Sequence, residues 1–235
     1  MNQPRVLIAC PTYEGMFYCL TEFLDAIKSL TYSNFEVLFV DNSKTDEYSK
    51  LIESKGYKVL RTVRFLNNKM NIVNSRNILR DRFIEGGYDY FFSVEQDVVL
   101  LPDAIERLLS HGKEIASGVY YKYKEECGFK VWYPVLMTAC DKEGNAIVSS
   151  EPDCLIRNMY SSEVEGNLLI EIEAAGLGCV MVSRKVLDKI KFRVENGKKS
   201  YDDMMFSVDV KKNGFKMYAD TSLKCKHLLD GKPEY

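Results

Sequence analysis

Two acidic side chains, Glu95 and Asp97, directly follow the apolar run 90–94, which is typical of a buried strand. A buried carboxylate costs free energy unless it has a partner, so two acids at the end of a core strand require one. Carboxylate oxygens are hard ligands that suit Mg²⁺ or Mn²⁺, and such sites often complete their shell with water and phosphate oxygens. Taken alone, the pair is more typical of a solvated turn before a helix. Other residues must therefore decide between a metal site and a turn.

Two further strands are also predicted to end in polar residues. These residues are Pro11, Thr12, Tyr13 and Glu14 after the run 6–10, and Asp41 after the run 35–40. Each of them has an ordinary structural explanation, because Pro, Asp and Thr are common in turns and at helix starts. The agreement between three strand ends is what favours a ligand site over three unrelated turns.

Strand-like and helix-like patterns alternate along the first 120 residues. Strands are expected at 6–10, 35–40, 57–60, 90–94 and 115–120, and helices at 16–30, 46–55, 72–85 and 102–111. This alternation predicts an α/β fold with a Rossmann-like, mostly parallel central sheet flanked by helices. Ligands of such sheets bind at the carboxyl ends of the strands, where the three polar ends would meet.

The pattern changes after about residue 120. Strands at 131–137 and 146–149 are expected to form a hairpin around the turn 141–145, and the polar segment 150–166 is expected to be a mobile loop. Later elements are expected as strands at 168–174, 178–183 and 215–219 and as helices at 184–190 and 202–213.

Composition excludes several classes of protein. The chain has 235 residues with 32 basic and 34 acidic side chains, so no global positive charge is available to attract nucleic acid. No run approaches the roughly 18 apolar residues of a membrane span, and no signal peptide is visible, so we expect a cytoplasmic protein without a transmembrane segment. Peripheral membrane association stays open. The seven cysteines form no C-x-x-C pair, which argues against a zinc site or a disulfide framework.

Several segments, in order, resemble nucleotide-sugar-dependent glycosyltransferases of the GT-A fold, and family 2 most closely. In the first half these segments are 6–14 (VLIACPTYE), 35–43 (FEVLFVDNS), 75–77 (SRN) and 94–97 (VEQD). In the second half they are 175–184 (AGLGCVMVSR), 201–206 (YDDMMF) and 213–227 (NGFKMYADTSLKCKH). The sequence departs from the family's D-x-D at Glu95, whose longer side chain replaces the first Asp, and from its Glu-Asp-x-x-Phe at Asp202.

The resemblance implies a role for individual residues. It assigns nucleotide binding to Pro11, Thr12, Tyr13, Glu14, Asp41, Arg76, Glu95 and Gln96, metal binding to Asp97 and His227, and a sugar pocket to Gly176 and Gly178. Aromatic faces can stack on sugar rings, so one or two of Tyr120, Tyr121, Tyr123, Trp132 and Tyr133 are also expected to line the acceptor pocket, with Trp132 as the named candidate. Either Asp202 or Asp203 would be the catalytic base of an inverting reaction. The ordinary alternatives are a solvated helix arginine at 76, two acids in a first helical turn at 202–203, and a surface histidine at 227.

The resemblance also implies an activity. The chain would be one GT-A domain over 1–235, with a nucleotide-sugar-binding half (1–100) and a smaller acceptor-binding and catalytic portion (101–235). It would transfer a sugar from a UDP- or GDP-linked donor to a hydroxyl acceptor with Mn²⁺ or Mg²⁺ as cofactor. A sugar-phosphate nucleotidyltransferase is an alternative, but the first loop lacks the basic residues expected of one. The second alternative is a non-catalytic nucleotide-sugar-binding module on the same fold.

Overall fold

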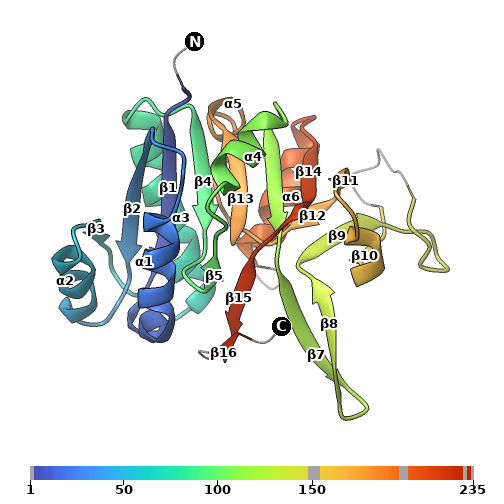
Figure 1. Cartoon of the computed structure of the whole chain (residues 1–235), viewed down its shortest axis with the longest axis horizontal. Helices are drawn as coiled ribbons and strands as arrows, with labels where there is room; N and C mark the ends of the chain where they lie inside the picture. The colour runs from blue at the N-terminus through green and yellow to red at the C-terminus, as the bar shows by residue number, and fades with distance from the viewer. Residues whose placement is uncertain (1–2, 148–153, 196–200, 230–231, 234–235) are drawn as a thin grey trace.

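The computed structural model describes residues 3–147, 154–195, 201–229 and 232–233. An eight-stranded sheet forms its centre, in the order β11-β14-β6-β13-β4-β1-β2-β3 (Figure 1). Its strands are β1 (Val6–Thr12), β2 (Phe35–Asp41), β3 (Lys58–Arg61), β4 (Tyr90–Val94), β6 (Ile115–Val119), β11 (Leu169–Ile172), β13 (Cys179–Ser183) and β14 (Met217–Lys224). Strands β11 and β13 run antiparallel to their neighbours and the others run parallel, so the prediction of a mostly parallel sheet is confirmed.

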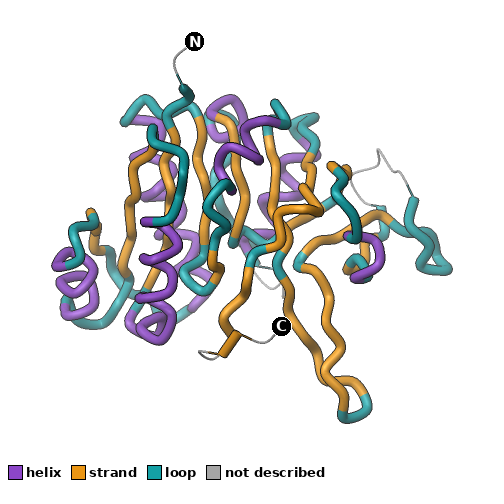
Figure 2. The backbone as a smooth tube through the Cα atoms, viewed as in Figure 1, coloured by secondary structure: helices purple, strands orange, loops and turns teal. Residues whose placement is uncertain are grey.

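Helices cover both faces of this sheet (Figure 2). They are α1 (Leu20–Lys28), α2 (Glu47–Ser54), α3 (Asn68–Glu85), α4 (Ala104–Ser110), α5 (Arg184–Leu187) and α6 (Asp202–Lys212), with the 3₁₀ helices η1 (Glu14–Cys19) and η2 (Ser161–Val164). Alternate residues of β1 enter opposite cores, because successive side chains of a strand point to opposite faces. Leu7 packs with apolar side chains of α3, α5 and α6. Ile8 packs with those of α1, α2 and α4.

A long hairpin extends from the body of the protein (Figure 1). It pairs β7 (Tyr121–Glu126) with β8 (Phe129–Pro134), whereas the sequence predicted that 131–137 would pair with 146–149. The turn is made by Cys127 and Gly128, whose φ angles are 51° and 81°. The predicted turn at 141–145 does form, because Asn145 O accepts a hydrogen bond from Asp141 N at 3.0 Å, and the bridge between Cys140 and Ala146 follows it. Residues 148–149 of the predicted second strand lie outside the described part of the chain.

The segment predicted to be a mobile loop, 150–166, contains ordered structure. Strand β10 (Ile156–Asn158) lies beside β9 (Leu136–Ala139), which also pairs with β12 (Ala174–Ala175). Arg157 binds both carboxylate oxygens of Glu163, at 2.7 and 2.9 Å, and this fork closes the segment on itself. The mobile-loop prediction is therefore wrong for 154–166, because Arg157 and Glu163 supply a local ion pair. Residues 150–153 lie outside the described part of the chain.

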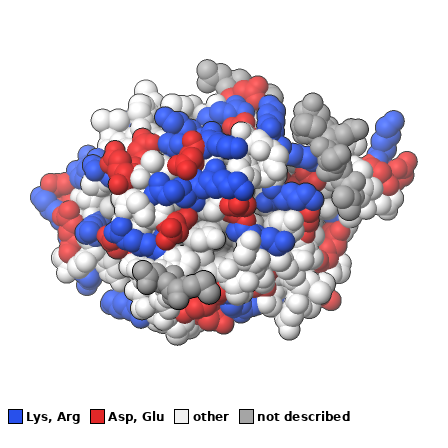
Figure 3. Space-filling view, turned by 90° about the horizontal axis from the view of Figure 1, so that it is seen from above, with Lys and Arg blue, Asp and Glu red and all other residues white. Residues whose placement is uncertain are grey.

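Positive and negative side chains are interspersed on the face seen in Figure 3, as a net charge of −2 leads one to expect. In the part of the chain that the structure describes, no helix combines the length and the apolar character needed to cross a membrane. In the described part of the chain no cysteine forms a disulfide, and Cys10, Cys19, Cys140, Cys179 and Cys225 are buried.

Candidate active site

The carboxyl ends of β1, β2 and β4 meet at one edge of the sheet, around a cavity of about 200 Å³. Its lining residues are Pro11, Thr12, Tyr13, Met16, Asn42, Ile72, Glu95, Gln96 and Asp97. The sequence had singled out most of these side chains from three separate strand ends. Glu14 and Asp41, which were predicted to bind the nucleotide too, do not line this cavity.

Gln96 and Thr12 line this cavity, which we name the donor cavity after the role that the resemblance predicts for it. Thr12 Oγ1 donates a hydrogen bond to Gln96 Oε1, and Gln96 Nε2 donates to Met16 O at 2.7 Å and to Tyr48 Oη at 2.6 Å. Both Gln96 and Thr12 are buried. Their side-chain polar atoms thus tie β1, β4 and α2 together and are already paired, so contact of these atoms with a nucleotide stays a prediction.

Asp41 is buried completely at the end of β2 and keeps one carboxylate oxygen without a hydrogen bond. Oδ1 accepts hydrogen bonds from the backbone and the hydroxyl of Ser43, whereas Oδ2 has only the Arg61 Nε at 3.9 Å. Burial raises the pKa of Asp41, although the two hydrogen bonds from Ser43 act to lower this pKa. An unpaired buried acceptor is expensive, so Oδ2 is suited to an incoming N–H or O–H donor.

Tyr13 lines the donor cavity, and it and its neighbour Glu14 both contact the side chain of Arg64. The Arg64 guanidinium lies 5.6 Å from the centre of the Tyr13 ring and 3.2 Å from Glu14 Oε2. Both side chains are exposed. The roles predicted for Tyr13 and Glu14 remain predictions.

Asp97 and His227 come together although 129 positions separate them in the sequence. Strand β15 (Lys226–Leu229) pairs with β5 (Val98–Val99), which places His227 opposite Val98. His227 is 1% exposed, and its Nε2 lies 3.3 Å from Asp97 Oδ2. Its Nδ1 lies 2.7 Å from the carbonyl oxygen of Tyr121.

Both ring nitrogens of His227 thus face oxygen acceptors, yet a neutral imidazole has only one N–H to donate. In the tautomer whose Nδ1–H donates to Tyr121 O, Nε2 presents a lone pair to the carboxylate. A cation between Nε2 and Asp97 removes this repulsion, and metal-binding histidines characteristically donate their other N–H to a carbonyl. Asp97 Oδ1 is buried and has no hydrogen-bond partner in the structure. These two side chains therefore fit a divalent cation.

The protein supplies only part of a metal shell. Among the described residues, no group of three or more His, Cys, Asp or Glu side chains is arranged to hold a metal ion. Mg²⁺ and Mn²⁺ accept such incomplete protein shells, because phosphate oxygens and water occupy the remaining positions.

Arg76, on α3, forms the centre of a buried network. Its guanidinium lies 2.6 Å from Ser93 Oγ, 2.8 Å from Glu95 Oε1 and 2.7 Å from Asp202 Oδ2. The last contact is an ion pair whose N–H is not aligned as a hydrogen bond. The resemblance assigned Arg76 to phosphate binding, and its partners here are carboxylates and a hydroxyl. With 1% exposure, Arg76 connects the acid after β4 to the acid that opens α6.

The two acids at the start of α6 differ in their surroundings. Asp202 is buried and paired with Arg76, whereas Asp203 lines a second cavity of about 150 Å³. Burial, and then the neighbouring charge of Asp202, raise the pKa of Asp203. Asp203 Oδ1 accepts a hydrogen bond from its neighbour's backbone, Met204 N, at 2.7 Å. Of the two, Asp203 is the acid that faces a cavity.

Gly176 and Gly178 allow the backbone to approach Tyr120, which is buried behind the site. A Cβ at 178 would lie 2.8 Å from the Tyr120 hydroxyl, and one at 176 would overlap the same group. Gly178 N donates a hydrogen bond to that hydroxyl at 3.1 Å, and the Tyr120 ring meets the His227 ring edge-on at 5.1 Å. Gly176 lines the acceptor-side cavity.

The structure places Trp132 away from the cavity that holds Asp203. Trp132 packs on Tyr123 with their ring centres 5.2 Å apart, while its neighbour Tyr133 lines the cavity. Adjacent strand residues point to opposite faces, so a role predicted for an aromatic side chain here passes from Trp132 to Tyr133. Lys122 also lines this cavity and was missed. The only signal for it in the sequence was the alternation Tyr-Lys-Tyr-Lys at 121–124.

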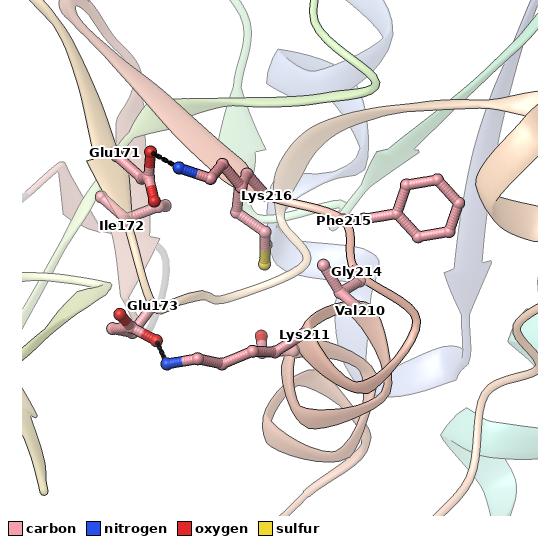
Figure 4. A pocket seen from close by; sticks show the side chains of 10 residues that line it. Glu171, Ile172, Glu173, Val210, Lys211, Gly214, Phe215 and Lys216 are labelled. Carbon is pink, nitrogen blue, oxygen red and sulfur yellow. Dashed lines mark hydrogen bonds and ion pairs between the residues drawn. The ribbon is translucent and has the colours of Figure 1, made fainter. Parts of the chain in front are cut away.

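A third cavity, also about 200 Å³, lies at the other end of α6 (Figure 4). Two ion pairs cross it, Glu171 with Lys216 at 2.9 Å and Glu173 with Lys211 at 2.6 Å. These charges neutralise each other and none of the predicted site residues is present, so we place no chemistry there.

Comparison with known proteins agrees with this arrangement. The family model described as "Glycosyl transferase family 2" matches residues 8–191. None of the curated proteins compared with the chain matches it. The match includes the donor cavity and Arg76 but ends before Asp202, Asp203 and His227, whose roles therefore rest on their geometry.

Two solved structures share the fold at low sequence identity. A mannosyltransferase from Pyrobaculum calidifontis, PcManGT, in complex with GDP-Man and Mn²⁺, is 13% identical with a TM-score of 0.61 over 98% of this chain. TarS 1–349 from S. aureus is 14% identical with a TM-score of 0.54 over 94% of this chain. The chain spans 59% of each of these two structures. With the family match over most of its length, the chain belongs to glycosyl transferase family 2, and it is a glycosyltransferase of the GT-A fold.

Proposed function

We propose that this glycosyltransferase is metal-dependent and transfers a sugar from a nucleoside-diphosphate sugar to a hydroxyl acceptor. Residues 1–100 provide the donor side and 101–235 the acceptor side. The relationship to PcManGT, whose structure contains GDP-Man and Mn²⁺, supports a donor and a cation of this kind. The acceptor is addressed below.

The donor side binds the nucleotide in the cavity at the ends of β1, β2 and β4. The unpaired Oδ2 of Asp41 is an acceptor for a ribose hydroxyl or a base N–H, provided that the nucleoside reaches past Asn42. Tyr13 lines the same cavity at its exposed rim. Asp97 and His227 hold the divalent cation, which when bound supplies Lewis-acid help to the departing diphosphate.

The acceptor side supplies the base. Asp203 accepts the proton of the acceptor hydroxyl while that oxygen forms a bond to the anomeric carbon. The bond from this carbon to the diphosphate oxygen breaks, and the nucleoside diphosphate leaves with the electron pair. A raised pKa makes Asp203 a stronger base than an exposed aspartate. A single displacement of this kind inverts the anomeric configuration.

Arg76 positions these two sides relative to each other. It binds Glu95 from the donor cavity and Asp202, the neighbour of the base, in one buried network. Asp202 is therefore a positioning residue in this proposal, and Asp203 is the base.

One observation carries the proposal: buried His227 places Nε2 3.3 Å from Asp97 Oδ2 while its Nδ1 lies 2.7 Å from Tyr121 O. The test is calorimetric titration of the protein with UDP and with GDP, each in Mn²⁺ and in EDTA. We expect one nucleotide to bind only with Mn²⁺, and Asp97→Ala to abolish that binding. The matched control is Asp25→Ala, because Asp25 is an exposed acid on α1.

Turnover then separates an enzyme from a binding module. Slow, Mn²⁺-dependent hydrolysis of UDP-glucose or GDP-mannose by the wild-type protein is expected, with loss in Asp97→Ala. Equal binding in Mn²⁺ and EDTA would refute the metal site. Metal-dependent binding without hydrolysis or transfer would point to a non-catalytic nucleotide-sugar-binding module.

A further inference from the structure

Lys122 is the one positive charge that lines the cavity of Asp203, among the residues that the structure describes. The only other charged lining residue there is Asp203 itself, and the rest are neutral and mostly apolar. Although burial raises the pKa of Asp203 and of Glu95, the charge of Lys122 acts on both carboxyls in the opposite direction. Lys122 therefore faces the reacting end of the acceptor cavity.

The ammonium of Lys122 is not used by the fold. Within the described residues, no carboxylate lies within ion-pair distance of it, whereas nearby basic side chains are paired. Lys124 lies 2.6 Å from Glu126, and Arg157 lies 2.7 Å from Glu163. An unpaired ammonium beside a base is costly for catalysis, because it weakens the base. An anionic ligand bound to the ammonium would offset this effect.

The backbone that carries Lys122 is held firmly. The residue before it, Tyr121, accepts the hydrogen bond of His227 through its carbonyl oxygen, and Tyr120 binds Gly178 N. In the β7–β8 ladder Lys122 lies opposite Tyr133, which lines the same cavity. The side chain thus starts from a fixed point next to the cation site and reaches into the acceptor side.

The cavity has room for little more than the reactive end of an acceptor. Its volume of about 150 Å³ is below the roughly 300–1,000 Å³ of ordinary ligand pockets. A group bound by Lys122 must therefore lie close to the hydroxyl that Asp203 deprotonates. A neutral sugar has no group that needs a full positive charge, whereas a carboxylate or a phosphate does.

We propose that Lys122 binds an anionic group, a carboxylate or a phosphate, that the acceptor carries near its attacking hydroxyl. This inference rests on the proposed function, since it assumes that Asp203 marks the acceptor side. The same ammonium could instead meet the diphosphate of the donor. Lys122 lines the cavity of Asp203 and not that of Asp97, which favours the acceptor.

The test compares three sugars that differ in charge: glucose, glucuronic acid and glucose 6-phosphate. Their binding to the protein with Mn²⁺ and nucleoside diphosphate is measured by calorimetry, for wild type, Lys122→Gln, Lys122→Arg and Lys124→Gln. We expect wild type to bind the two anionic sugars more tightly than glucose. Lys122→Gln should weaken the anionic sugars about tenfold and leave glucose unchanged. Lys122→Arg should retain most of the preference, and Lys124→Gln all of it.

Titration of the same samples with UDP and GDP separates the two sources of anion. Unchanged nucleotide affinity in Lys122→Gln supports the acceptor role. Loss of nucleotide affinity in that variant, without an effect on the sugars, would move Lys122 to the donor and overturn the inference. Equal binding of all three sugars by wild type would overturn it too. A preference for anionic sugars in a protein that binds neither nucleotide would leave Lys122 in place and refute the proposed donor site.

Discussion

Replacing Arg76 by Met tests whether the network between Glu95 and Asp202 holds the two sides of the active site together. The guanidinium is 1% exposed and has three partners within 2.8 Å, namely Ser93, Glu95 and Asp202. Three hydrogen bonds or ion pairs to a charged group, at about 1.5–3 kcal/mol each, give an upper limit of about 9 kcal/mol. Desolvation of the arginine offsets a large part of this sum.

The expected loss is therefore smaller than the upper limit. Removing one partner from a buried ion pair costs about 3–5 kcal/mol, because the remaining charge stays buried without compensation. Asp202 would be left in this state, since it is 3% exposed. A loss of this size is a large fraction of the roughly 5–15 kcal/mol that stabilises a typical domain.

The assay is urea unfolding at pH 7, followed by circular dichroism and by the fluorescence of the single tryptophan, Trp132. Arg82→Met is the matched control, because Arg82 lies on the same helix with its side chain 57% exposed and an i,i+3 pair to Glu85. This control should change the unfolding free energy by no more than about 0.5 kcal/mol.

Two further variants keep the test informative if Arg76→Met does not fold. Arg76→Lys retains the charge but loses the planar fork, and should fall between wild type and Arg76→Met. Adding Asp202→Asn to Arg76→Met removes the unpaired carboxylate and should restore part of the lost stability. A loss below about 1 kcal/mol in Arg76→Met would refute the reasoning.

Two other predictions follow from the acceptor side. Asp203→Asn should lower sugar transfer about 10²–10⁴-fold without changing nucleotide affinity, and wild-type transfer should fall as the pH drops through the raised pKa of Asp203. Because the folded state holds this proton more tightly than the unfolded state, wild-type stability should decline as the pH rises through that pKa. Asp203→Asn should thus be more stable than wild type at pH 8 but not at pH 3, and an equal difference at both would contradict the assignment. Gly178→Ala should cost about 1–3 kcal/mol in urea unfolding, since its Cβ would lie 2.8 Å from the Tyr120 hydroxyl and 2.9 Å from Val98 Cγ2. Val98→Ala in the same chain should recover part of that loss, and an undiminished loss would contradict the overlap.

The alternation of strands and helices was predictable because each core strand is a continuous apolar run. Residues 90–94 illustrate this, since both faces of β4 are buried and the run ends in Glu95. The parallel arrangement then brings the strand ends together without any knowledge of long-range contacts. Most residues that line the donor cavity could therefore be predicted from local sequence patterns alone.

The partners of Arg76 could not be predicted from local patterns. Nothing near position 76 distinguishes a buried arginine from a solvated one on a polar helix, and its acids lie 19 and 126 positions further along the chain. The same limit left Asp202 and Asp203 equivalent in the sequence. In the structure the ion pair of Asp202 with Arg76 and the position of Asp203 in the second cavity separate them.

The hairpin β7–β8 was missed because its turn, Cys127-Gly128, lacks the usual Asn-Gly or Asp-Gly signal. The strand partner of 131–134 was therefore placed after this segment and not before it. Such an error has a chemical consequence, because a shift of one residue exchanges the faces of a strand. Without this register the sequence could not separate Trp132 from Tyr133 within its aromatic cluster, and it is Tyr133 that lines the cavity, together with Lys122.

The short pairing of β15 with β5 governs when the active site can form during protein synthesis. Asp97 leaves the ribosome well before His227, and residues 226–227 join the site only by pairing with 98–99. A nascent chain that stops after β14 already contains every strand of the eight-stranded sheet, yet it lacks His227, one of the two cation ligands that we propose. If the proposed cation site is correct, nucleotide binding should therefore appear only in chains that extend past residue 227.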